Sequence, residues 1–77
     1  DYLRQLRQDL HFCRKFGVSD HMARLGLAGT EKQYLMQLLG RVNYVLQITP
    51  GKKEWAQARA WLLVQLSSLN DSSPVIS

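Results

Sequence analysis

Apolar residues at helical spacing are the feature that most constrains the fold of this chain. Between Tyr2 and Phe16 they recur at steps of three, four and three residues, at Leu3, Leu6, Leu10 and Cys13. This spacing places all four side chains on one face of an α-helix. No segment alternates polar and apolar residues in the way that a β-hairpin needs. The sequence therefore predicts an all-α fold.

Helix boundaries can be assigned from glycine and from capping residues. Gly17 ends the first predicted helix, and a short second helix is expected over about 19–25. Thr30 is placed to cap a third helix, with Gln33 three residues later in the capping-box position. This third helix is expected to end near Gln47.

The clearest break in the chain is Pro50-Gly51, a pair that favours a tight turn. A fourth helix is expected from about Lys52 to Leu69. We therefore predict a three- or four-helix bundle with short connections. Residues 1–70 are expected to form this helical bundle domain, and the polar segment 71–77 a flexible C-terminal tail.

Composition narrows the classes of protein to which the chain can belong. With 77 residues, of which 45% are hydrophobic, there is material for one compact domain. Cys13 is the only cysteine, so no disulfide can form within the chain, and with His11 and His21 it does not give the spacing of a zinc finger. We expect no metal site. A lone cysteine and the lack of a long apolar run favour an intracellular protein, cytoplasmic or nuclear, without a membrane partner.

No sequence motif points to catalysis. The segment 26–29 lacks the spacing and the following lysine of a phosphate-binding loop. The six acidic residues are scattered, and Cys13 belongs to the apolar face, where a thiol is ordinarily inert. His21 is expected on a helix surface. The chain is therefore expected not to be an enzyme, with no catalytic residue, no cofactor and no small-molecule substrate.

Positive charge is concentrated on the first predicted helix. The chain has a net charge of +4, and five basic residues lie within an arc of about 100° opposite the apolar face. We call them the basic stripe: Arg4, Arg7, His11, Arg14 and Lys15. Like charges four residues apart slightly destabilise a helix, so the pattern fits an anion-binding surface. An ordinary solvated helix face is the alternative, and the sequence leaves both open.

The fourth predicted helix is more apolar than a surface helix should be. It carries no charge from Ala60 to Asn70, and both Trp61 and Val64 project away from its core-facing stripe. Two explanations remain open. The helix could be the central element of the bundle, buried on several sides, or Trp61 and Val64 could face a partner. Arg59 is expected to snorkel or to stack on Trp55.

The third predicted helix carries a related feature. Gly40 lies on the side opposite its core face, near Met36 and Tyr44. A glycine in a helix either allows a close approach by another group or is accidental. A second apolar surface is therefore possible, and the full set of candidate partner-binding residues is Trp61, Val64, Tyr44, Met36 and Gly40.

Two functional hypotheses follow. The first is a non-enzymatic protein–protein interaction module, part of a larger protein or assembly, that docks an apolar patch while the basic stripe steers it to an acidic partner or to a second copy. The alternative is a DNA-binding domain in which the basic stripe contacts phosphates through Arg4, Arg7, Arg14 and Lys15, and in which 19–35 has the outline of a helix-turn-helix. The first turn of its second helix offers only Lys32 and Gln33 to read bases, and Glu31 would face phosphate.

Overall fold

The computed structural model describes residues 2–71, with side chains up to residue 69. It contains four helices and no strand within that range, which confirms the predicted all-α bundle. The helices are α1 (Tyr2–Phe16), α2 (Val18–Leu25), α3 (Glu31–Ile48) and α4 (Lys53–Asp71). Of the predicted 71–77 tail, residue 71 is the last of α4, and 72–77 lie outside the described residues.

The boundaries of α2 and α3 follow from local hydrogen bonds. α2 ends at Gly26, whose left-handed conformation, with a φ of 69°, lets its N–H bond to the Ala23 carbonyl while the next N–H reaches Met22. α3 begins with the predicted capping box. The Thr30 hydroxyl accepts from the Gln33 N–H at 3.1 Å, and the Gln33 side-chain oxygen accepts from the Thr30 N–H at 3.3 Å.

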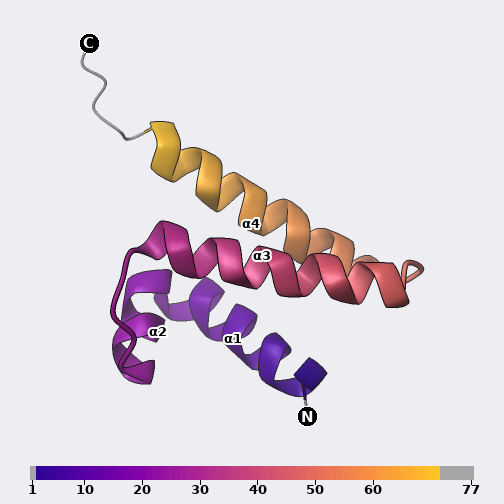
Figure 1. Cartoon of the computed structure of the whole chain (residues 1–77), viewed down its shortest axis with the longest axis horizontal. Coiled ribbons are helices and arrows are strands. Elements are labelled where there is room, and N and C mark those ends of the chain that lie inside the picture. Colours follow the sequence, from indigo (N-terminus) through magenta and orange to yellow (C-terminus); the bar gives the residue numbers. More distant parts are fainter. Residues whose placement is uncertain (1, 72–77) are drawn as a thin grey trace.

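α3 lies between α1 and α2 on one side and α4 on the other (Figure 1). Within the described residues, α3 is the only helix against which α4 packs closely. The radius of gyration is 13.1 Å, whereas a compact chain of this size would give about 11 Å. The sequence left open a central position for the fourth helix, and the structure excludes it.

The hydrophobic core is built around α3. Tyr34, Leu35, Leu38, Val42 and Val45 are buried along it, against side chains from the other three helices. The contributions of those helices are Leu6, Leu10 and Cys13 from α1, Val18 and Met22 from α2, and Trp55, Ala58 and Leu62 from α4. Trp61, Leu66 and Leu69 are only partly buried against this core. Burial of α4 thus decreases toward its C-terminal half.

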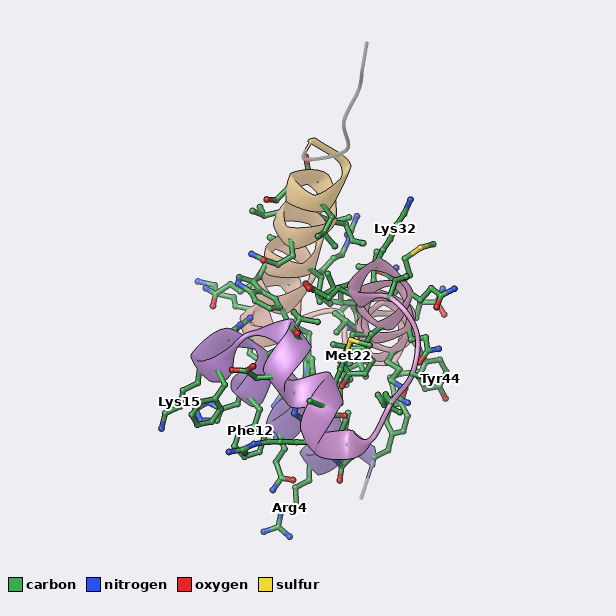
Figure 2. All side chains as sticks on the ribbon, turned by 90° about the vertical axis from the view of Figure 1, so that its left-hand side faces the viewer. Arg4, Phe12, Lys15, Met22, Lys32 and Tyr44 are labelled. Carbon is green, nitrogen blue, oxygen red and sulfur yellow. The ribbon has the colours of Figure 1, made fainter. Side chains whose placement is uncertain are left out.

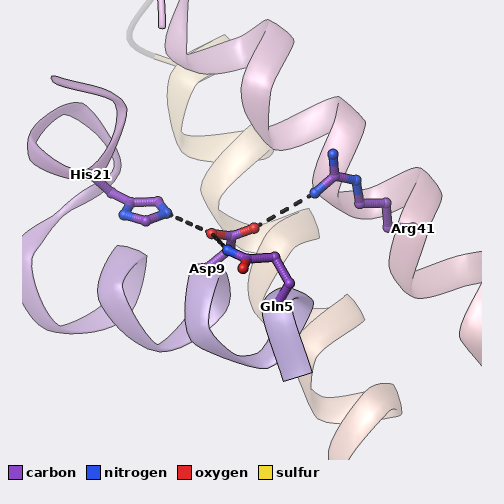
Figure 3. A network of polar contacts seen from close by, with 4 residues as sticks. All are labelled: Gln5, Asp9, His21 and Arg41. Carbon is purple, nitrogen blue, oxygen red and sulfur yellow. Dashed lines mark hydrogen bonds and ion pairs between the residues drawn. The ribbon is translucent and has the colours of Figure 1, made fainter. Parts of the chain in front are cut away.

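A buried polar network joins α1 to α2 and α3 (Figure 3). The Asp9 carboxylate lies 3.0 Å from Nε2 of His21, accepts a hydrogen bond from Nε2 of Gln5 at 3.2 Å, and is 3.6 Å from Nη1 of Arg41. The side chains of Asp9 and His21 are only 5% and 4% exposed. The expectation of a surface position for His21 is therefore wrong.

The reason for this burial can be seen in the helical spacing. Asp9 follows Leu6 by three residues and precedes Cys13 by four, so it falls within the buried stripe of α1. His21 lies three residues after Val18 and shares its buried side of α2. A carboxylate buried among apolar side chains needs partners, and the three polar side chains supply them. The network therefore fixes the orientation of α1 relative to α2 and α3.

Replacing Asp9 by alanine should destabilise the domain, because His21 then loses its buried partner. We expect Asp9→Ala to lower the free energy of unfolding by about 2–3 kcal/mol in urea denaturation. The matched control is Asp20→Ala, which removes an exposed acid from the first turn of α2 and should change stability by less than about 1 kcal/mol. Equal effects of the two variants would mean that the network does not stabilise the fold.

Gly40 has no structural requirement for glycine within its own chain. It is exposed in the middle of α3, and an added Cβ would meet no atom within 4 Å. Gly40→Ala should therefore stabilise the domain by about 0.5–1 kcal/mol. Gly26→Ala, where φ is positive, should instead destabilise it. Thermal unfolding of both variants tests the prediction, and a loss of stability in Gly40→Ala would contradict it.

Candidate functional site

A groove of about 210 Å³ separates α1 from the first half of α4. Residues from α1 form one wall and residues from α4 the other. The α1 wall is Arg7, Leu10, His11 and Arg14, and the α4 wall is Glu54, Trp55, Gln57 and Ala58. Three of the five basic-stripe residues thus line a groove with apolar and polar surfaces, which is the kind of concave site that binds another molecule.

An ion pair joins the two walls of the groove. Arg7 donates from Nε to Glu54 at 2.9 Å and from Nη2 at 3.0 Å, a bidentate contact between exposed side chains. The hydrogen bond and the charge of Glu54 raise the pKa of Arg7. The Arg7 guanidinium also lies 5.4 Å from the Trp55 ring centre. Within the described residues the cation found beside Trp55 is therefore Arg7, and the predicted stacking of Arg59 on that ring is not seen.

Further along the groove, Arg14 lies beside Trp61 without a carboxylate partner. Its guanidinium is 5.4 Å from the centre of the Trp61 ring, and both side chains reach solvent. Within residues 2–69, the carboxylates in ion pairs are those of Asp9 and Glu54, and neither contacts Arg14. Arg14 is therefore a positioned cation that remains open to an anion.

Arg4 and Lys15, the outer members of the basic stripe, are not among the residues that line the groove. Arg4 and Lys15 extend into solvent at the periphery of the molecule (Figure 2), and Lys15 lies 5.4 Å from the Phe16 ring. Arg24 of α2 joins this region with its guanidinium 4.7 Å from the same ring. Sequence analysis missed Arg24. The sequence gives no signal for this contact, because it depends on how α2 packs against the aromatic end of α1.

The C-terminal half of α4 carries apolar side chains that its own chain leaves uncovered. Val64 is 61% exposed, Leu63 is 45% exposed and Trp61 is half-buried. We call these three residues the outer face of α4. At 100° per residue, Val64 lies opposite the α3-facing side that includes Leu62. The helical pattern predicts Leu63 on the core-facing stripe of α4, and its exposure shows that this prediction is wrong.

The other predicted apolar residues form a separate surface. Met36, Gly40 and Tyr44 follow one another at steps of four along the exposed side of α3. The Tyr44 ring makes an edge contact with Tyr2 of α1, at 6.3 Å between centres. The five predicted partner-binding residues therefore belong to two surfaces, one on α4 and one on α3.

Cys13 is positioned for packing rather than for nucleophilic chemistry. It is buried in the core, and burial together with the nearby Asp9 charge raises the pKa of its thiol to about 11. The protonated thiol is a poor nucleophile. Within the described residues, no group of three or more histidine, cysteine, aspartate and glutamate side chains could hold a metal ion. None of the described helices has the length and apolar character needed to cross a lipid bilayer.

Comparison of the chain with protein-family models, curated proteins and solved structures gives no match.

The raised pKa of Cys13 predicts a loss of stability in alkali. In the unfolded chain the thiol titrates near 9.0, whereas in the folded domain it stays protonated to about pH 11. The free energy of unfolding should therefore fall as the pH rises from about 9 to about 11, because the unfolded state loses its proton first. Burial also raises the pKa of Tyr34, which acts in the same direction.

The contribution of the thiol can be isolated with Cys13→Ala. Urea denaturation of this variant between pH 8 and pH 11 should show a shallower loss of stability than the native chain. Parallel curves for the two proteins would show that the thiol does not titrate differently on folding.

Proposed function

We propose that this domain is a non-enzymatic protein-interaction module that docks an acidic partner protein on the outer face of α4. The observation that carries the proposal is the exposure of Leu63 and Val64, beside the partly buried Trp61, on a helix that packs closely only against α3 within the described residues. A solvated helix normally carries polar side chains on the side away from the core. Burial of this apolar surface by a partner would supply the free energy of binding.

The charge of the domain favours an acidic partner over a second copy. The net charge is +4, so two copies would repel each other as they approach. The outer face of α4 is bordered by Arg14 across the groove and by Arg59 on α4 itself, both exposed. Basic residues at the rim of an apolar patch accelerate association with an acidic surface and select against basic ones. The partner class that fits is an amphipathic segment with acidic flanks.

Nucleic-acid binding remains the second candidate, supported by Arg4, Arg14 and Lys15, which have no carboxylate partner within residues 2–69. Two observations weigh against it. Arg7 is already bound by Glu54, and the Gln33 side chain is engaged in the capping box rather than free to read a base. The apolar outer face of α4 also has no role in phosphate contacts.

Val64→Asp tests the proposal directly. The probe is a labelled synthetic helical peptide with leucine along one face and glutamate on both flanks, titrated with the domain and followed by fluorescence anisotropy. We expect the native domain to bind it and Val64→Asp to weaken binding at least about tenfold, because a charge enters the apolar contact. Circular dichroism should show unchanged helical content, since Val64 is exposed.

The matched control is Met36→Asp. It introduces the same charge at a residue of similar exposure, 56%, on the outer side of α3, and should leave peptide binding unchanged. The proposal fails if the native domain does not bind the peptide, or if the Val64→Asp variant binds it with the same affinity as the native domain. Binding of a short DNA duplex that weakens steeply with salt would favour the second candidate.

A further inference from the structure

We infer that Arg14, backed by the Trp61 indole, is an open binding position for one carboxylate, and that the docked protein fills it with an aspartate or glutamate side chain. This inference rests on the proposed function, since the carboxylate belongs to the partner. It adds the chemistry of one specific contact in the groove between α1 and α4.

The groove already contains a filled example of such a contact. Arg7 lies against the Trp55 ring, and the edge of its guanidinium donates two hydrogen bonds to the Glu54 carboxylate. The aromatic ring packs against the guanidinium, while the N–H groups along its edge remain available to an acceptor. The chain itself therefore shows that an arginine of this groove, held beside a tryptophan, binds a carboxylate in bidentate fashion.

The second position also holds an arginine beside a tryptophan, but it has no acid from the described residues. α1 and α4 run in roughly the same direction (Figure 1). Arg14 follows Arg7 by seven residues, and Trp61 follows Glu54 by seven, so each pair lies two helical turns further on. The position that holds the Glu54 acid beside Arg7 is thus taken by the Trp61 indole beside Arg14, and the ring centre of Trp61 lies 5.4 Å from the Arg14 guanidinium, the same distance as between Arg7 and Trp55. The guanidinium is positioned, but its acceptor is missing.

The surroundings of Arg14 suit a side chain with one negative charge. His11 and Gln57 line the groove beside it and offer further hydrogen-bonding groups. The volume of about 210 Å³ accommodates one side chain. Glu54 lines the same groove, and its charge would repel a phosphate dianion more strongly than a carboxylate. Trp61 also belongs to the outer face of α4, so a bound carboxylate would lie at the edge of the apolar contact.

The first experiment follows the arginine Nε–Hε resonances of the intact chain by NMR. The probe is N-acetyl-glutamic acid α-amide, a monoanionic carboxylate, added at constant ionic strength. We expect the Arg14 resonance to shift saturably. The Arg7 resonance should not shift, because Glu54 already accepts the hydrogen bonds of its guanidinium. The Arg4 resonance should not shift, because no aromatic ring holds that side chain in place. Equal shifts of Arg4 and Arg14, or no shift of Arg14, would overturn the inference, as would a larger response of Arg14 to inorganic phosphate.

Two substitutions change which arginine of the groove has a carboxylate partner. Gln57→Glu is nearly isosteric and places an internal acid on the wall that faces Arg14, so the response of Arg14 to the probe should disappear. Glu54→Gln frees Arg7, which should then respond as Arg14 does in the native chain. Unchanged responses in both variants would show that the groove does not organise these two arginines.

The second experiment uses the leucine- and glutamate-bearing peptide described above. Arg14→Gln should weaken its binding about tenfold, the effect of one lost charge-assisted contact, whereas Arg4→Gln should weaken it less than twofold. Equal effects of the two variants would overturn the inference while leaving the proposed docking intact. If the native domain does not bind the peptide but Arg14 still responds to the small carboxylate, the docking proposal fails and the carboxylate position stands.

Discussion

α3 packs against α1 and α2 on one side and against α4 on the other, and this arrangement determines which surfaces the domain exposes. A single helix presents only a limited apolar stripe to each neighbour. The stripe that includes Val42 buries Trp55, Ala58 and Leu62 in the first half of α4. No helix within the described residues covers the opposite side of α4, so the apolar side chains there remain in contact with water. The exposed outer face is thus a consequence of how few helices share the core.

Two polar contacts set the position of α1 within this arrangement. The buried Asp9 carboxylate, in contact with His21 and Arg41, ties α1 to α2 and α3. On the other side of α1, the pair between Arg7 and Glu54 reaches across to α4. The basic side of α1 is therefore held toward α4, with a groove in between. A buried acid with partners on two helices specifies one orientation in a way that apolar contacts alone do not.

Local structure could be predicted from the sequence because its causes are local. The capping box at Thr30 and Gln33, the stop at Gly17 and the turn at Pro50-Gly51 each depend on residues that are adjacent or nearly so. These signals placed all four helices close to their observed bounds.

Contacts between helices were harder to predict, because a helical projection gives the direction of a side chain but not its neighbour. The projection of the first helix showed Asp9 away from the basic stripe. It could not show that His21 and Arg41 would contact the Asp9 carboxylate. The projection of the fourth helix placed Arg59 on the side of Trp55, whereas Arg7 reaches that ring from another helix. The spacing of Asp9 between Leu6 and Cys13 was the one available sign that an acid would be buried.

We propose that Trp61, unlike Trp55, faces a docking site. The two indoles report on this separately, since Trp55 is 2% exposed in the core and Trp61 is half-buried beside Arg14. The most direct measurement is the NMR signal of each indole N–H during titration with the acidic amphipathic peptide. The Trp61 signal should shift with peptide concentration while the Trp55 signal stays in place. A shift of the Trp55 signal alone, equal shifts of both signals, or no shift of either would contradict the proposal that Trp61 faces the docking site.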